Sequence, residues 1–302
     1  MMSVHVSRTL VLGLVLFCAG LISGPQMSRA QSEPIQLTST GGSHPTASRD
    51  GIWIAYRQMD GGIARIPVSG GEPEVLNSTG WEPDWGRPGD LIVFRVYLSL
   101  FTLDAVTHDV QLICTGGFDD DPAWSPLGNE IAVQGSHTSI TIVAYPGGET
   151  SSIPCDDPDG SDCAGEGPTW SPDAAYLAFE DGLDLLTVAR AGGTAELIHH
   201  CPWDLSEPAW SPDGQWIAVT MGDSTSYDYR HIWVIDARGS SFGMSQQTFG
   251  SFADSDPAWS SDGGAIYFTS SRTGNSEIWM VQVSLPTPVE QATWGQIKNR
   301  FR

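Results

Sequence analysis

The sequence predicts an all-β protein, and more narrowly a six-bladed β-propeller of four-stranded antiparallel blades. The first observation is a phrase that recurs six times: a proline that is mostly followed by x-Trp-Ser, then a turn and an apolar run. The second is the spacing of the copies, about 40 to 50 residues, which is typical of propellers and other repeat architectures. The prolines that anchor the six copies are Pro45, Pro83, Pro122, Pro168, Pro208 and Pro257.

Each copy has the residue pattern of short strands joined by tight turns. In the best-preserved copy, which begins at Pro208, the turn is Ser-Pro-Asp-Gly, where proline presets φ and glycine tolerates positive φ. Apolar runs follow at 217–220 and 232–236, and fourth strands such as 195–198 come after a Gly-Gly turn. The gaps are too short for the crossovers that parallel strands require. We expect the recurring tryptophans to pack between blades and the Asp of Ser-Pro-Asp to accept bonds from its own turn.

Two segments compete to be the last strand of the ring. Residues 34–38 and residues 289–293 both have the pattern of a fourth strand. We expect one of them to complete the outer edge of the last blade, because an unclosed ring would expose strand edges that invite aggregation.

The N-terminal segment reads as a secretory signal. Arg8 supplies a positive charge, residues 10–22 are apolar, and the Ser-Arg-Ala that ends at Ala30 fits a cleavage site. The alternative is a membrane anchor, for which the apolar stretch is short. We therefore expect residues 1–30 to be a signal peptide that is removed, no transmembrane segment afterwards, and a single propeller domain at 31–302. Such a protein is secreted, and we expect it in the periplasm.

The repeated phrase carries a resemblance to a known family. Pro-Ala-Trp-Ser-Pro-Asp-Gly, followed by a strand, by Ile-Trp-Val-Ile-Asp and by Gln-Leu-Thr, resembles the TolB-type propeller repeat, which prolyl oligopeptidase-like enzymes also contain. The resemblance covers about residues 34–294 and implies a scaffold that many proteins reuse. We expect no Gly-x-Ser-x-Gly nucleophile elbow, and hence no peptidase activity. The resemblance to TolB implies a protein-binding module of the cell envelope.

The charge of the chain is strongly acidic. The formal net charge is −22 at pH 7, from 14 basic and 36 acidic residues. Nucleic acid and anionic membranes need a basic surface, so neither is an expected partner. The acidity instead fits a site for cations or for a basic partner, or else a surface adapted for solubility.

The residue before each anchor proline should face the mouth of the central channel, where the first strand of each blade begins. Gathered carboxylates repel one another unless a cation or a basic group lies among them. In the alternative, each acid caps its own loop by accepting backbone N–H bonds. Trp81 and Trp203, in loops on the mouth side, are candidate apolar contacts for a partner. The six residues before the prolines are His44, Glu82, Asp121, Gly167, Glu207 and Asp256.

A second candidate site is an acidic insertion bracketed by two cysteines. Asp157, Asp159 and Asp162 alternate around a glycine as in calcium-binding loops, although the bidentate Glu of an EF-hand is missing, and a solvated acidic loop is the alternative. Secretion permits disulfides, so we expect Cys155 and Cys163 to pair. Cys114 and Cys201 end strands in separated blades, and we expect them to be free or paired differently.

The function expected from these features is a monomeric, non-catalytic module that binds a basic envelope protein or peptide at its acidic channel mouth. The residues identify no certain cofactor, and Ca²⁺ is the candidate ion. The alternative is a secreted carbohydrate-active enzyme, a lyase or hydrolase that uses the mouth carboxylates. Oligogalacturonate lyases resemble this repeat family, but they need a metal site rich in channel histidines, and only His44 occupies such a position.

Overall fold

The chain divides into two units, residues 1–30 and residues 31–302. The computed structural model describes residues 32–86, 89–116, 121–135, 139–156, 165–222 and 229–285. The expected signal peptide lies outside these ranges and stays a prediction. Within them the secondary structure consists of strands and turns, and nothing forms a helix with the length and apolarity needed to span a membrane.

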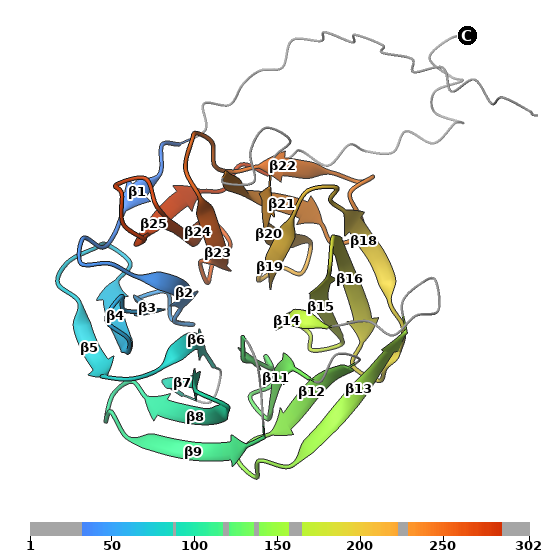
Figure 1. Ribbon diagram of the computed structural model, residues 1–302, viewed down its shortest axis with the longest axis horizontal. Coiled ribbons are helices and arrows are strands. Elements are labelled where there is room, and N and C mark those ends of the chain that lie inside the picture. The colour runs from blue at the N-terminus through green and yellow to red at the C-terminus, as the bar shows by residue number, and fades with distance from the viewer. Residues whose placement is uncertain are drawn as a thin grey trace, which may run out of the picture. The chain divides into compact units, whose positions relative to one another are not determined.

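The second unit is a six-bladed β-propeller, as the sequence predicted. Six antiparallel sheets of four strands follow one another around a central axis (Figure 1). The first three blades are β2 (Ser43–Ala47), β3 (Trp53–Arg57), β4 (Ile63–Pro67) and β5 (Glu74–Asn77); β6 (Trp81–Trp85), β7 (Leu91–Val96), β8 (Ser99–Asp104) and β9 (Val110–Thr115); β10 (Ala123–Trp124), β11 (Glu130–Gln134), β12 (Ser139–Ala144) and β13 (Thr150–Asp156).

The remaining blades repeat this order, and the third sheet gains one short extra strand. That strand, β17 (Gly193–Thr194), pairs in parallel with the end of β13. The last three blades are β14 (Glu166–Trp170), β15 (Tyr176–Asp181), β16 (Asp184–Ala189) and β18 (Glu196–His200); β19 (Leu205–Trp210), β20 (Trp216–Gly222), β21 (Arg230–Asp236) and β22 (Met244–Gln246); β23 (Asp254–Trp259), β24 (Ala265–Ser270), β25 (Glu277–Gln282) and β1 (Ile35–Gln36).

The N-terminal strand closes the ring. β1 pairs antiparallel with β25 and so becomes the outer strand of the sixth blade. A buried latch fixes this closure, because the Thr38 hydroxyl donates to Glu277 Oε2 at 2.7 Å and the Gly41 N–H donates to the same oxygen at 3.0 Å. The rival segment, residues 289–293, lies outside the described residues.

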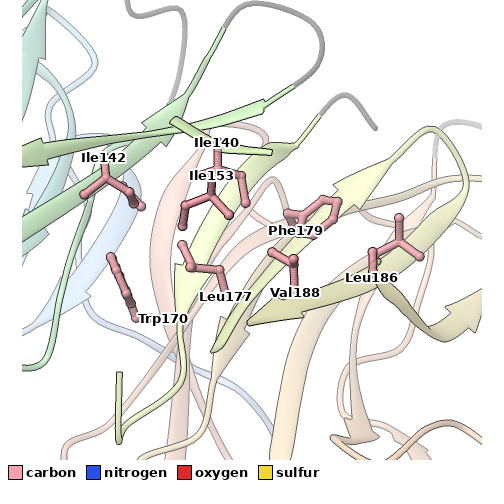
Figure 2. Close-up of a cluster of buried hydrophobic side chains, with 10 residues drawn as sticks. Ile140, Ile142, Ile153, Trp170, Leu177, Phe179, Leu186 and Val188 are labelled. Carbon is pink, nitrogen blue, oxygen red and sulfur yellow. The ribbon is translucent and has the colours of Figure 1, made fainter. Parts of the chain in front are cut away.

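The core lies between neighbouring blades. The second strand of each blade is sandwiched on both faces, so its central residues are continuously apolar and buried, as with Ile54, Ala55 and Tyr56 in β3. Figure 2 shows one such layer, which combines residues of the third and fourth blades. Each large side chain buried there contributes about 1.5–3 kcal/mol. The labelled residues of the layer are Ile140, Ile142, Ile153, Trp170, Leu177, Phe179, Leu186 and Val188.

The roles predicted for the recurring Trp and Asp residues are confirmed. Trp170 and Trp259 are buried, and each donates its indole N–H to a backbone carbonyl of the preceding blade, at 3.1 and 3.0 Å respectively. In the Ser-Pro-Asp turn of the fifth blade, Asp213 accepts the Ser211 hydroxyl at 2.6 Å and the Gln215 N–H at 3.0 Å. The residues of the repeated phrase therefore specify the packing between blades and the turns within them. The residue before each anchor proline takes no part in the tryptophan packing or in these turns.

Candidate functional site

The six residues before the anchor prolines share an unusual backbone conformation. All six have positive φ, a conformation that is uncommon for residues other than glycine and that persists only where the surroundings enforce it. In five of the blades a register shift between the first two strands falls at this position, and such β-bulges re-aim a side chain. The φ angles are 51° at His44, 52° at Glu82, 34° at Asp121, 53° at Gly167, 58° at Glu207 and 52° at Asp256.

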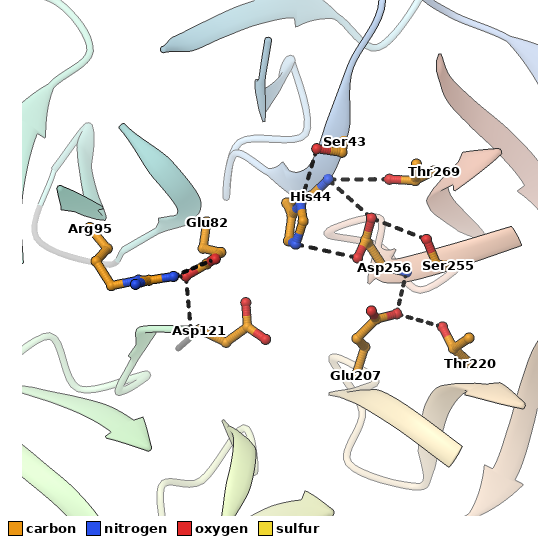
Figure 3. A network of polar contacts seen from close by, with 10 residues as sticks. All are labelled: Ser43, His44, Glu82, Arg95, Asp121, Glu207, Thr220, Ser255, Asp256 and Thr269. Atoms are coloured by element: carbon orange, nitrogen blue, oxygen red, sulfur yellow. Dashed lines mark hydrogen bonds and ion pairs between the residues drawn. The ribbon is translucent and has the colours of Figure 1, made fainter. Parts of the chain in front are cut away.

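The bulges bring these residues together around one central cavity. All six line a channel cavity of about 580 Å³, and Figure 3 shows five of them facing a common space. The sequence therefore predicted correctly which residues meet. The two tryptophans are placed differently, because neither lines this cavity. Trp81 is the first residue of β6 and not a loop residue as expected, and Trp203 lies in the loop between β18 and β19.

Four of the six residues, Glu82, Asp121, Glu207 and Asp256, are acidic and are called the acidic ring here. Carboxylates of this ring accept hydrogen bonds across blade boundaries (Figure 3). Glu207 Oε2 accepts the N–H of Asp256 at 2.7 Å, and Asp256 Oδ2 accepts the N–H of His44 at 3.3 Å. Glu82 Oε2 likewise accepts the N–H of Asp121 at 3.3 Å. The expected alternative, in which each acid accepts N–H bonds of its own loop, is therefore wrong about the donor. Glu82, Glu207 and Asp256 each accept the N–H of the residue at the same position in the next blade. These residues hold neighbouring blades in register and also place their charge at the channel.

Cationic side chains offset part of this charge. Arg95, at the end of β7, binds Glu82 through two nitrogens at 2.8 Å each. His44 Nε2 lies 3.5 Å from Asp256 Oδ1. One ligand atom each from His44, Glu82 and Asp121 lie within 4.8 Å of one another, a mixed imidazole and carboxylate set that could hold a divalent cation. The guanidinium of Arg95 beside Glu82 would oppose such an ion.

Glu207 has the most perturbed chemistry of the ring. Burial raises the pKa of Glu207 well above its usual range, and the negative charges of Asp256 and Asp121 raise it further. The Thr220 hydroxyl, which donates to Glu207 at 2.7 Å, and the Asp256 N–H act in the opposite direction. Glu207 is thus a carboxyl residue with a raised pKa that lies directly beside a second carboxyl residue, Asp256.

This shift predicts a pH-dependent stability difference. A raised folded-state pKa means that Glu207 supports folding below its ordinary pKa of 4.5 and that this contribution is lost as pH rises through the folded value. The free energy of unfolding of Glu207→Gln, relative to the native chain, should therefore increase from pH 4.5 to pH 8, by up to about 1.4 kcal/mol per pH unit in the window. Urea unfolding at several pH values measures this difference in the free energy of unfolding. Glu196→Gln is the control, because Glu196 is exposed. A pH-independent difference would contradict the assignment.

A second buried carboxyl, that of Asp84, lines the channel and was not predicted from the repeat. Asp84 Oδ2 accepts the N–H of Trp124 at 2.7 Å, and its other oxygen accepts the Thr46 hydroxyl at 3.1 Å. Burial raises the pKa of Asp84. Asp84 therefore ties the second blade to the first and the third. The sequence could have indicated this role, because Asp84 is the one acidic residue that follows an anchor proline, and the other blades have alanine or threonine there.

The mouth face also carries most of the exposed aromatic side chains. Antiparallel order places the loops that lead into each first strand on the same face as the turns between second and third strands. Five of the seven exposed aromatic residues in the described ranges occupy these positions, and Tyr176 and Phe242 do not. Aromatic residues are enriched at protein interfaces. The five are Trp81, Tyr97, Trp203, Phe249 and Phe252.

Of the cysteine and calcium predictions, the structure tests only the one on Cys114 and Cys201. Cys114 and Cys201 are free, as one of the two expectations had it, and Cys201 Sγ donates to the carbonyl of Asp204 at 3.1 Å. The proposed partner of Cys155, which is Cys163, lies outside the described residues. The three aspartates of the expected calcium loop lie outside them too, so both the disulfide and the loop stay predictions. Those aspartates are Asp157, Asp159 and Asp162.

The expectation of no Gly-x-Ser-x-Gly pattern was wrong. Gly239-Ser-Ser-Phe-Gly243 matches it. These residues form the hairpin turn between β21 and β22, where the Asp236 N–H donates to the Gly243 carbonyl at 2.9 Å. A nucleophile elbow needs a strand that turns directly into a helix. The local context here is a strand-to-strand turn away from the channel, so the pattern does not build a hydrolase site.

Comparison with known proteins agrees with the TolB resemblance. Residues 160–300 match the family model of the TolB beta propeller domain. One curated relative, from Bacillus subtilis (strain 168) and named Uncharacterized peptidase YuxL, is 40% identical over 70 residues. That match covers 21% of this chain and 11% of the relative, so the chain spans only about a tenth of that protein.

Solved structures share the fold at low identity. The putative TolB from Agrobacterium tumefaciens aligns with a TM-score of 0.64 and 16% identity, over 82% of this chain and 92% of that one. An oligogalacturonate lyase in complex with manganese aligns with a TM-score of 0.56 and 13% identity, over 85% and 94%. These likenesses show the propeller fold, and they include both a TolB and an enzyme.

Proposed function

From the TolB-type β-propeller repeat that this chain carries, we propose that the protein is a non-catalytic protein-binding module of the cell envelope. Its acidic channel mouth receives a basic segment of a partner protein. The observation that carries this proposal is the convergence of four carboxyl residues, Glu82, Asp121, Glu207 and Asp256, on one cavity of about 580 Å³. A cavity of that size accommodates a small number of side chains.

The ring favours a cationic guest for an electrostatic reason. A guanidinium or ammonium group between Glu207 and Asp256 would offset the repulsion that helps to hold the proton on Glu207. Binding would then release that proton, so affinity for a basic segment should rise with pH. At Glu82 the guest would compete with Arg95, which already satisfies that carboxylate. The aromatic residues around the mouth would supply the apolar contacts of a protein interface.

Affinity capture tests the proposal. The purified full chain is immobilised, incubated with envelope extract, and the bound proteins are identified by mass spectrometry. The ring variant replaces the four acids by their amides, Glu82→Gln, Asp121→Asn, Glu207→Gln and Asp256→Asn. A control with the same change in net charge replaces exposed acids outside the ring by their amides: Glu72→Gln, Asp90→Asn, Asp109→Asn and Glu196→Gln.

We expect a specific, salt-sensitive partner that the native chain and the control capture and that the ring variant loses. The proposal fails if the ring variant retains the partner. It fails equally if the native chain captures no protein above the background of the bare support.

One observation favours a second candidate function, a carbohydrate-active enzyme. Glu207, whose pKa is raised by burial, lies beside a second carboxyl residue, Asp256, and a carboxyl with a raised pKa next to another is an arrangement that acid–base catalysis uses. Turnover of envelope or plant-wall glycans that is abolished in Asp121→Asn and Glu207→Gln would support this function. Binding of a partner without glycan turnover would leave the binding module as the account of the site.

A further inference from the structure

A second cluster of functional groups lies beside the acidic ring but outside the channel cavity. This rim cluster consists of Arg57, Trp81, Arg95 and Tyr97. The Trp81 and Tyr97 rings are 6.2 Å apart between centroids, and the guanidinium carbons of Arg57 and Arg95 lie 5.4 and 5.6 Å from the Trp81 centroid. Trp81 is 37% exposed and Tyr97 is 76% exposed. The cluster therefore combines two exposed aromatic rings with two guanidinium groups, of which Arg95 is held by Glu82.

The two arginines of the rim cluster are in different states. Arg95 binds both oxygens of Glu82 and donates to the carbonyl of Tyr97 at 3.2 Å. The guanidinium of Arg57 makes no ion pair and no hydrogen bond with any residue in the described ranges, and its Nε is buried without an acceptor. A buried donor without a partner is destabilising, because it has lost its bond to water and gained no other. In a chain of net charge −22 an arginine without a carboxylate partner is conspicuous, and it points to an acceptor that arrives from outside.

The strand register places this cluster directly next to the ring. Arg57 pairs with Ser43, the residue before His44, and Arg95 pairs with Trp81, the residue before Glu82. A segment that leaves the channel past Glu82 therefore runs over Trp81. Tyr97 stands at the tip of the β7–β8 hairpin with φ of 52°, a left-handed conformation that holds this side chain at the exposed turn.

We propose that the rim cluster binds an acidic side chain of the partner protein, together with an aromatic neighbour that packs on Trp81 and Tyr97. The inference rests on the proposed function, because the same partner places its basic segment in the channel. Arginine suits this task, since its planar fork matches a carboxylate with two hydrogen bonds. A negative channel beside a positive rim would fix the direction of the bound segment, because the reversed direction would set like charges against each other.

Synthetic peptides test the proposal. One peptide has an Arg-Arg head, a flexible Gly-Ser spacer and a Trp-Glu tail, and its twin ends in Trp-Gln. The native chain should bind the Glu peptide about tenfold more tightly than the Gln peptide, because a charge-assisted bidentate pair replaces a neutral contact. Arg57→Gln should abolish this preference while it preserves the dependence on the Arg-Arg head. Arg65→Gln is the matched control, since Arg65 already pairs with Glu74 at 2.7 Å.

Peptides without the basic head separate the two proposals. Blocked Trp-Glu should bind weakly to the native chain, more tightly than blocked Trp-Gln, and Arg57→Gln should remove the difference. If the native chain does not distinguish the Glu from the Gln tail in either pair, or if Arg57→Gln still does, the rim proposal is overturned. If tail selectivity is present but the Arg-Arg head adds no affinity, the rim proposal stands and the channel proposal fails.

Discussion

Replacement of Asp254 by alanine is expected to lower the free energy of unfolding by about 3–5 kcal/mol, the cost of stranding one partner of a buried ion pair. Asp254 is fully buried at the start of β23. It accepts the Ser270 hydroxyl at 2.6 Å and two nitrogens of Arg272 at 2.6 and 3.2 Å. Without Asp254, Arg272 would remain among aromatic rings with no carboxylate. Phe252, Phe268 and Trp279 lie within 5.7 Å of its guanidinium carbon.

The pH dependence of this effect has a definite sign. Burial alone would raise the pKa of Asp254, but the nearby His231 ring, whose Nδ1 lies 3.7 Å away, and the hydrogen bonds from Arg272 and Ser270 outweigh burial and lower the pKa. The carboxylate therefore stabilises the fold above its ordinary pKa of 3.8 and loses this contribution on acidification. The difference between the native chain and Asp254→Ala should shrink below that pH.

Urea unfolding at neutral pH measures the effect. Asp236→Ala is the control, because the side chain of its partner Arg238 is 68% exposed and stays solvated when the carboxylate is removed, whereas that of Arg272 is only 12% exposed. The control should lose less stability, and Asp254→Asn should fall between the two. A loss below about 1 kcal/mol for Asp254→Ala would show that the cluster is not a structural anchor of the sixth blade.

Removal of the closing latch should have the second largest effect. Glu277→Ala would leave the Thr38 hydroxyl and the Gly41 N–H without their acceptor, in a place where Glu277 is only 3% exposed. Two hydrogen bonds to a buried carboxylate predict a loss of about 2–4 kcal/mol. The Leu37 N–H, which donates to the Ile278 carbonyl at 2.8 Å, should exchange with solvent faster as β1 detaches.

A double-mutant cycle with Thr38→Val and hydrogen exchange together check this prediction. Residues in direct contact should show a coupling of about 0.5–3 kcal/mol. Amides of the second blade, far from the closure, should keep their native protection and serve as the internal control. Additive losses, or faster exchange throughout the ring, would mean that closure does not depend on this latch.

The sequence predicted the fold well because every blade repeats the same physical requirements. Trp170 and its counterparts fill the same gap between blades, and Asp213 and its counterparts complete the same turn. The ring positions were predictable for the same reason, since the residue before each anchor proline has the same register in every blade. A periodic pattern specifies all of its copies at once.

The details of the site depend on contacts that no repeat encodes. Arg95 reaches Glu82 because the two lie near the adjacent ends of paired strands, and this pairing is set by a bulge. The hydrogen bonds from one blade's carboxylate to the next blade's N–H depend on how far neighbouring blades are rotated, as at Glu207 and Asp256. Which terminus closes the ring was also undecided, because both have the residues of a fourth strand and packing against β25 selects β1.

The central claim, that the acidic ring is an electrostatic receptor for a basic segment, is tested most directly by titration of an oligoarginine peptide. The native chain, the ring variant and the charge-matched control are titrated at low and high salt by calorimetry. The account predicts that the peptide binds the native chain and the control with strong salt dependence. The ring variant should bind at least about tenfold more weakly at low salt, with a flat salt dependence. Equal affinity and equal salt dependence for the ring variant and the control would contradict it.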